Sequence, residues 1–224
     1  MQDRALRTRS AILAAAAKVF EERGYSAATI SEVLAEAKVT KGALYFHFQS
    51  KEDLVEGVLG EQDARMPVPP RACKIQELVD AVMLQAHRLQ TDCMVRAGVR
   101  LALDQRISEQ ERTGPFVRWA LICQDVLEGA QRQGELMPHV VPSQTADVFV
   151  GSFAGIQSMS QAMSDYRDLM PRVAALLRHV LPSVVQSSVL ASIDLSEDRG
   201  ARVYEECMLL RANESHRPDA VPVS

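Results

Sequence analysis

Apolar residues recur every three or four positions in the first part of the chain. Between Leu6 and Arg23 they include Ile12, Val19 and Phe20, the spacing of one face of an α-helix. Gly24 follows at once and is a natural helix end. The pattern predicts a first helix over about 6–23.

Two short helices follow in the pattern. The second has its apolar positions at Ala28, Ile30, Val33, Leu34 and Ala37. Thr29 is placed to cap its start and Glu32 stands three residues on, which is the capping-box spacing. Thr40 caps a third helix that runs to about Phe46. These two short, capped helices together predict a helix-turn-helix.

A fourth helix begins after Ser50, with Asp53 three residues later in a pattern close to the capping box. It ends before the segment MPVPP at 66–70, because prolines cannot continue a helix. We expect the domain junction there, with an N-terminal domain at 1–65.

The rest of the chain is predicted to be helical. Candidate helices cover about 73–90, 92–106, 115–133, 143–164, 169–186 and 197–212, with breaks at Gly114-Pro115, Pro138, Pro142 and Pro182. No alternating pattern of useful length predicts a strand. We expect an all-α protein whose second domain spans 71–212, followed by a polar tail at 213–224 that we expect to be disordered.

Composition narrows the class of protein. The chain has 224 residues and a formal charge of -4, yet the cations Arg4, Arg7, Arg9, Lys38, Lys41 and Lys51 all fall in its first 51 residues. The net charge of the chain therefore neither supports nor excludes binding to nucleic acid. There is no signal-peptide pattern and no apolar run near the roughly 20 residues needed to span a bilayer, so we expect a cytoplasmic protein.

The cysteines do not form a recognisable site. Cys73, Cys93, Cys123 and Cys207 are irregularly spaced, unlike a disulfide framework or a zinc site. Reduced thiols are favoured over a redox role. We expect no metal and no cofactor.

The segment from Thr29 to Leu54 has the residue types that a DNA-reading element needs. Some side chains must reach base edges and others must grip phosphates. The Thr40 hydroxyl can donate to a phosphate, and Lys41 can reach a guanine edge or a phosphate. Gly42 and Ala43 are small and let the backbone approach the groove floor.

The aromatic part of this segment allows two interpretations. Tyr45 and His47 offer a hydroxyl and an imidazole to the DNA backbone, whereas Leu44, Phe46 and Phe48 are assigned to the core. Taken singly, His47 is more often structural, Tyr45 a half-buried aromatic and Lys51 a solvated charge. Their joint occurrence after a capped turn favours DNA contact.

This region resembles the TetR family of bacterial repressors. The matching residues are Phe20, Gly24, Thr29 and the run VTKGALYFHFQSKEDL at 39–54, and the match covers about the first 60 residues. The resemblance implies that Thr29, Thr40, Lys41, Tyr45, His47 and Lys51 contact DNA. One departure is Lys38, where the family usually has glycine. A lysine there needs a positive φ at a cost of about 1 kcal/mol, and its charge beside the phosphates can compensate.

The second domain carries a candidate ligand site. Trp119, the only tryptophan, shares a helix face with Phe116, Ile122 and Cys123, and periodicity alone favours a core role for it. The segment 143–164 contains Gly151 and Gly155, which cost a helix about 1 kcal/mol each, and they suit a close helix approach or a ligand. We take as pocket candidates Trp119, Phe116, Cys123, Gln124, Phe149, Phe153 and Gln157, with the two glutamines as polar groups in an apolar pocket.

Trp119 and the SMSQA segment near Ser158 are similar to the γ-butyrolactone autoregulator receptors within the TetR family. That resemblance implies a pocket tryptophan, a butyrolactone or butenolide signal, and release of repression at secondary-metabolite genes. A pseudo-receptor that answers to an antibiotic or another apolar ligand, or a ligand-independent regulator, fits the residues equally well.

A homodimer is expected because one helix-turn-helix reads only a few base pairs of a palindromic operator. The apolar surfaces for a four-helix interface are placed on 143–164 and 169–186, at Phe149, Gly151, Ile156, Val173, Leu176, Leu177 and Val180. An intramolecular core is an equal alternative for each residue. The chain has no G-x-S-x-G, H-E-x-x-H or Gly-rich phosphate motif, so an enzyme is not expected.

Overall fold

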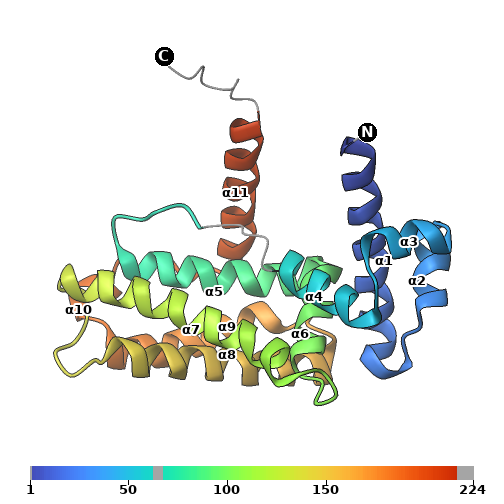
Figure 1. The fold of residues 1–224 in the computed structure, drawn as a ribbon. Helices are drawn as coiled ribbons and strands as arrows, with labels where there is room; N and C mark the ends of the chain where they lie inside the picture. Colours follow the sequence, from blue (N-terminus) through green and yellow to red (C-terminus); the bar gives the residue numbers. More distant parts are fainter. Residues whose placement is uncertain (1, 63–67, 216–224) are drawn as a thin grey trace. The chain divides into compact units, whose positions relative to one another are not determined.

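The computed structural model describes residues 2–62 and 68–215, and over that part of the chain the predicted all-α class is confirmed (Figure 1). The helices there are α1 (Gln2–Ala27), α2 (Ile30–Ala37), α3 (Lys41–His47), α4 (Lys51–Gln62), α5 (Lys74–Thr91), α6 (Cys93–Ala102), α7 (Glu109–Arg132), α8 (Pro142–Ser164), α9 (Leu169–Val184), α10 (Ser187–Leu190) and α11 (Arg199–Ser215). None of these helices is both long enough and apolar enough to cross a bilayer.

The chain divides into two compact units. Unit 1 is Met1–Arg65 with Thr91–Arg118, and unit 2 is Met66–Gln90 with Trp119–Ser224. Unit 1 therefore takes in α6 and the start of α7, which the sequence assigned to the second domain. As a division into functional domains, the boundaries 1–65 and 71–212 stay a prediction.

Unit 1 is built around α1. Figure 1 shows α2 and α3 beside it, and α1 also packs on α4 and α6. The shared core holds Leu13, Phe20, Val33, Leu44 and Phe48. The apolar stripe predicted on the first helix is therefore the face that carries the helix-turn-helix.

The end of α1 is fixed by arginines of α6. Gly24, where the sequence predicted the helix to end, breaks it with φ 72° and ψ 173°, and α1 resumes beyond this break to Ala27. Arg96 pairs with the Glu21 carboxylate, and Arg100 donates to the Glu21 carbonyl. These contacts tie the carboxyl-terminal part of α1 to residues that lie 75 and 79 positions further along the chain.

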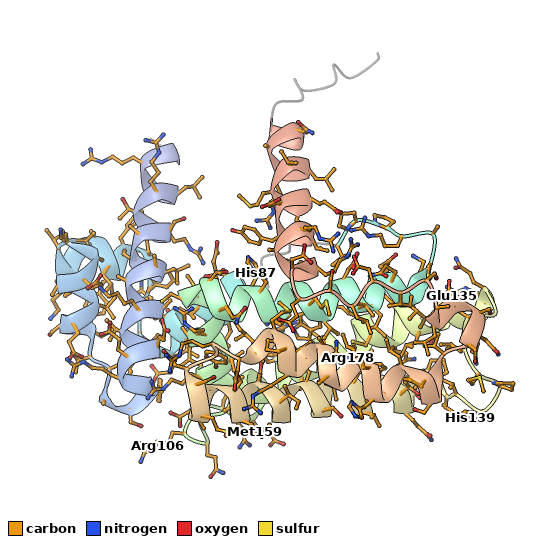
Figure 2. The ribbon with its side chains drawn as sticks, turned by 180° about the vertical axis from the view of Figure 1, so that it is seen from behind. His87, Arg106, Glu135, His139, Met159 and Arg178 are labelled. Atoms are coloured by element: carbon orange, nitrogen blue, oxygen red, sulfur yellow. The ribbon has the colours of Figure 1, made fainter. Side chains whose placement is uncertain are left out.

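Unit 2 contains two buried carboxylates that join its helices. Glu135, labelled in Figure 2, accepts hydrogen bonds from the backbone N–H groups of Lys74, at 3.0 Å, and Ile75, at 2.8 Å. Asp80 on α5 is fully buried and accepts from Arg71, at 2.7 Å, and from both nitrogens of an Arg199 fork, at 2.7 and 2.6 Å. A buried carboxylate is tolerated only with such partners, so these groups fix the ends of α5 and α11.

Two expected helix breaks are wrong. Pro115 lies inside α7, which begins six residues earlier at Glu109, and Pro182 lies inside α9, which continues to Val184. Pro115 is buried, so its ring packs in the interior and offsets the hydrogen bond that a proline removes. Pro142 does begin a helix, and Pro138 does lie in a turn.

The end of the chain differs in part from the expectation. The last helix runs to Ser215, so the first three residues of the expected disordered tail are helical. The remainder, 216–224, and the first two residues of the proline segment, 66–67, lie outside the described residues.

Candidate DNA interface and ligand site

Both helices of the helix-turn-helix are capped as predicted. The Thr29 hydroxyl accepts from the Glu32 N–H at 3.2 Å, and the Glu32 carboxylate accepts from the Thr29 N–H at 2.9 Å. A further hydrogen bond from the Thr29 hydroxyl helps hold the pKa of Glu32 below its usual range. Thr40 accepts from the Ala43 N–H at 3.3 Å. Short helices are marginal alone, so these caps help define where α2 and α3 begin.

The turn between them is made by Lys38 in the left-handed conformation. Its φ is 54° and its ψ 39°, and its backbone N–H donates to the carbonyl of Leu34. The positive φ predicted for this lysine is confirmed. Its side chain is exposed, so the cation stands at the surface of the turn.

The first turn of α3 leaves its side chains free to meet a partner. Thr40, Lys41 and Gly42 are exposed, and Ala43 is half-buried. A Cβ added to Gly42 would meet nothing within 4 Å, so no packing inside the chain demands this glycine. The Lys41 ammonium lies 5.8 Å from the centre of the Tyr45 ring, which is at the limit of a cation–π contact.

The second turn of α3 corrects one assignment. Leu44 and Phe48 are buried as expected, but Phe46 is 76% exposed. The reason is helical geometry, because residues two apart lie on opposite sides of a helix. The Phe46 ring meets His47 edge-on with 5.0 Å between ring centres. Sequence reasoning missed this exposed aromatic, although the inward positions of Leu44 and Phe48 could have revealed it.

The start of α4 adds a cation beside the motif. The Lys51 ammonium lies 4.4 Å from the centre of the Tyr25 ring, and the Tyr25 hydroxyl donates to Glu52 at 2.6 Å. Partial burial lowers the pKa of Lys51. Ser50 accepts from the Asp53 N–H at 3.0 Å, which is the predicted cap.

An exposed surface of aromatic and basic side chains thus covers the α2–α3 turn and α3. It consists of Lys38, Lys41, Tyr45 and Phe46. We call these four residues the reading surface. Leu44 and Phe48 anchor its underside in the core of unit 1. A short helix anchored on one side, with cations and aromatic rings on the other, has the chemistry of a DNA recognition helix.

The candidate ligand residues of unit 2 lie on two helices. On α7, Cys123 is buried and Trp119 half-buried, and desolvation raises the pKa of the Cys123 thiol to about 12. Gln124 is half-buried and donates to Glu128 at 2.8 Å. Phe116 is half-buried on the part of α7 that belongs to unit 1, and Ile122, expected on the inner face, is exposed.

On α8, Phe149 is buried and Phe153 half-buried. Gln157 is only 5% exposed, and its Oε1 has no hydrogen-bond partner within the described chain. A buried acceptor without a donor costs about 1–3 kcal/mol. Such an atom in a protein interior requires an explanation, and a polar group of a bound molecule supplies one.

The fold and the reading surface define a helix-turn-helix DNA-binding protein with a separate helical unit. Comparison with known proteins agrees. The model of bacterial regulatory proteins of the tetR family matches residues 12–58. The A-factor receptor protein of Streptomyces griseus is 40% identical over 192 residues, which cover 86% of this chain and 69% of that protein.

Solved structures extend the similarity to the second unit. TylP, a TetR regulator from Streptomyces fradiae, matches with a TM-score of 0.83 and 39% identity, over 92% of this chain and 99% of TylP. An ArpA-like γ-butyrolactone receptor matches with a TM-score of 0.70 and 29% identity, over 91% of this chain and 98% of the receptor. The chain belongs to the TetR family of bacterial regulatory proteins. It is a DNA-binding regulator and not an enzyme.

Proposed function

We propose that the protein is a cytoplasmic, homodimeric repressor that a γ-butyrolactone or butenolide-type signal releases from a palindromic operator, and that it controls secondary-metabolite genes. The similarity to the A-factor receptor over most of the chain supports the class of signal. The main support for operator binding is the reading surface, most of whose side chains project from a helix that buried Leu44 and Phe48 hold in the core.

The DNA contacts divide by chemistry. Lys41 and Phe46 meet base edges, the first a guanine and the second a thymine methyl. Thr29, Lys38, Thr40, Tyr45, His47 and Lys51 contact phosphates, which position the protein without reading sequence. Gly42 and Ala43 permit close approach. We add Phe46 to this set because its ring is 76% exposed.

The ligand site lies in unit 2. We assign its apolar lining to Trp119, Cys123, Phe149 and Phe153, and keep Gln124 as a further candidate. Phe116 belongs to unit 1 and is left out of this site. Gln157 is the polar group, because its Oε1 has no partner among the described residues and can accept a hydrogen bond from a donor on the ligand. A hydroxyl beside an apolar body is the ligand chemistry that fits.

The dimer interface is assigned to the outer face of α8. Phe149, Val173 and Leu177, which the sequence offered for pairing, are buried within the single chain and cannot serve. The exposed apolar stripe is instead Val148, Gly151, Gly155, Met159 and Met163, at helical spacing. A Cβ on either glycine would meet nothing within 4 Å, and Met159 is marked in Figure 2. Small residues along such a stripe allow a second helix to approach closely.

The test is fluorescence anisotropy of the purified protein on labelled DNA from upstream of its own gene, with unlabelled random duplex as competitor. The proposal predicts operator binding that random DNA does not displace and that a synthetic γ-butyrolactone or butenolide reverses. Specific binding that neither compound affects would reject this class of signal and point to the pseudo-receptor alternative. Binding without sequence preference would reject the repressor.

A further inference from the structure

The first two turns of α1 carry a cluster of cations that the helix-turn-helix contacts do not use. Arg4, Arg7 and Arg9 are exposed, and no carboxylate of the described residues pairs with any of them. From Arg4 to Phe20 the sequence contains no Asp or Glu. By contrast Lys18, further along the same helix, pairs with Glu36 at 2.8 Å.

These arginines lie at the end of the helix where they contribute least to folding. The amino-terminal end of a helix carries a partial positive charge, so cations there are unfavourable and anions favourable. Three unpaired guanidinium groups in two turns also repel one another. No carboxylate of the described residues neutralises the cluster, so its charge is available to an external anion.

Its position identifies the anion. The Arg9 guanidinium lies 5.3 Å from the centre of the Phe48 ring, and Phe48 is the C-cap of α3. Figure 1 shows the amino-terminal end of α1 extending past α3 within unit 1. Arg4 is five residues before Arg9, roughly 7.5 Å along the axis at 1.5 Å per residue. The cluster thus begins at the end of the recognition helix and continues beyond it.

We propose that Arg4 and Arg7 bind phosphate groups of the duplex that flank the bases read by α3. This proposal rests on the DNA-binding function above and enlarges its footprint. Guanidinium groups match phosphate oxygens in a bidentate geometry. Phosphate contacts carry no sequence information, so the cluster strengthens binding to any duplex that is long enough to reach it.

The experiment measures the DNA-binding constant K of the Arg4→Gln and Arg7→Gln variants at several salt concentrations, on operator duplex and on random duplex. Each phosphate contact contributes about 0.9 to the slope of log K against log salt. Each variant should therefore lower that slope by about 0.9 and weaken both duplexes by the same factor. Arg132→Gln, which removes an exposed arginine of unit 2, is the matched control and should leave the slope unchanged.

A second arm uses duplex length. On an operator trimmed to its palindrome, the wild type and the Arg4→Gln/Arg7→Gln variant should bind with similar affinity. Added flanks should strengthen binding of the wild type alone. If flanks strengthen both proteins equally, or if the slope is unchanged, the flanking contact is wrong while operator specificity stands. If the wild type does not prefer operator over random DNA, the repressor function itself fails. Circular dichroism of the variants confirms that α1 still folds.

Discussion

The backbone N–H of Lys38 donates to the carbonyl of Leu34 and ends α2 with the lysine in the left-handed conformation. A residue with a Cβ pays about 1 kcal/mol there relative to glycine. The turn therefore keeps a strained residue whose side chain is exposed. We attribute its presence to the cation that it places on the reading surface.

Lys38→Gly should separate the strain from the charge. We expect the free energy of unfolding to rise by up to about 1 kcal/mol because glycine adopts a positive φ freely, while operator affinity falls. Lys38→Ala is the matched control, since it removes the charge but keeps the strain. Urea unfolding and operator titration measure the two effects. Unchanged operator affinity in both variants would show that Lys38 does not contact DNA.

The two sides of α3 should respond differently to truncation. Tyr45→Ala and Phe46→Ala should weaken operator binding and cost much less stability than truncation of Leu44, because Tyr45 is 36% and Phe46 76% exposed. Leu44→Ala should cost about 2–5 kcal/mol of stability, since it empties a fully buried site. Operator titration measures the affinity of the three variants for DNA, and calorimetry measures their thermal stability. A large loss of stability in Phe46→Ala would show that the Phe46 ring packs in the core and is not an exposed DNA contact.

Gln157→Met tests the polar group of the ligand site. The substitution keeps side-chain length and removes a buried acceptor that has no partner, so stability should not fall. Ligand affinity should fall by about tenfold, the upper range for one hydrogen bond. Gln144→Met, at an exposed position of the same helix, is the control. Normal ligand release by Gln157→Met would remove this residue from the site.

Met159→Glu tests the dimer stripe on α8. Burying an unpaired charge costs several kcal/mol, so the dimer dissociation constant should rise at least about tenfold. Met208→Glu makes the same change at an exposed methionine of α11 and should have no effect. Sedimentation of both variants against the wild type is the measurement. If Met159→Glu sediments as a normal dimer, the interface lies elsewhere.

Local chemistry made the DNA-binding half predictable. The capping box of Thr29 and Glu32, the positive φ of Lys38 and the break of α1 at Gly24 depend on neighbouring residues alone. Each was therefore visible in the sequence, and so was the family. The exposure of Phe46 was missed because an aromatic residue was assigned to the core by its type, without regard to its angular position.

The second half depends on contacts between distant segments. Pro115 is accommodated inside α7 because it is buried, which no local pattern shows. Phe149 and Val173 are apolar whether they face a partner or the chain's own core, so sequence could not choose between these roles. The ion pair of Asp80 with Arg199 joins α5 to a residue more than a hundred positions away, and spacing does not predict it.

Ligand and operator are proposed to favour different states of one protein, so each must weaken binding of the other by the same factor. Because Trp119 is the only tryptophan, its fluorescence can report binding of a synthetic γ-butyrolactone to free protein and to protein saturated with operator. We predict weaker ligand binding to the complex, by the same factor as the loss of operator affinity on adding ligand, on the order of 5–150-fold. Equal ligand affinity in the two titrations, or no binding to the free protein, would contradict a repressor that this ligand releases.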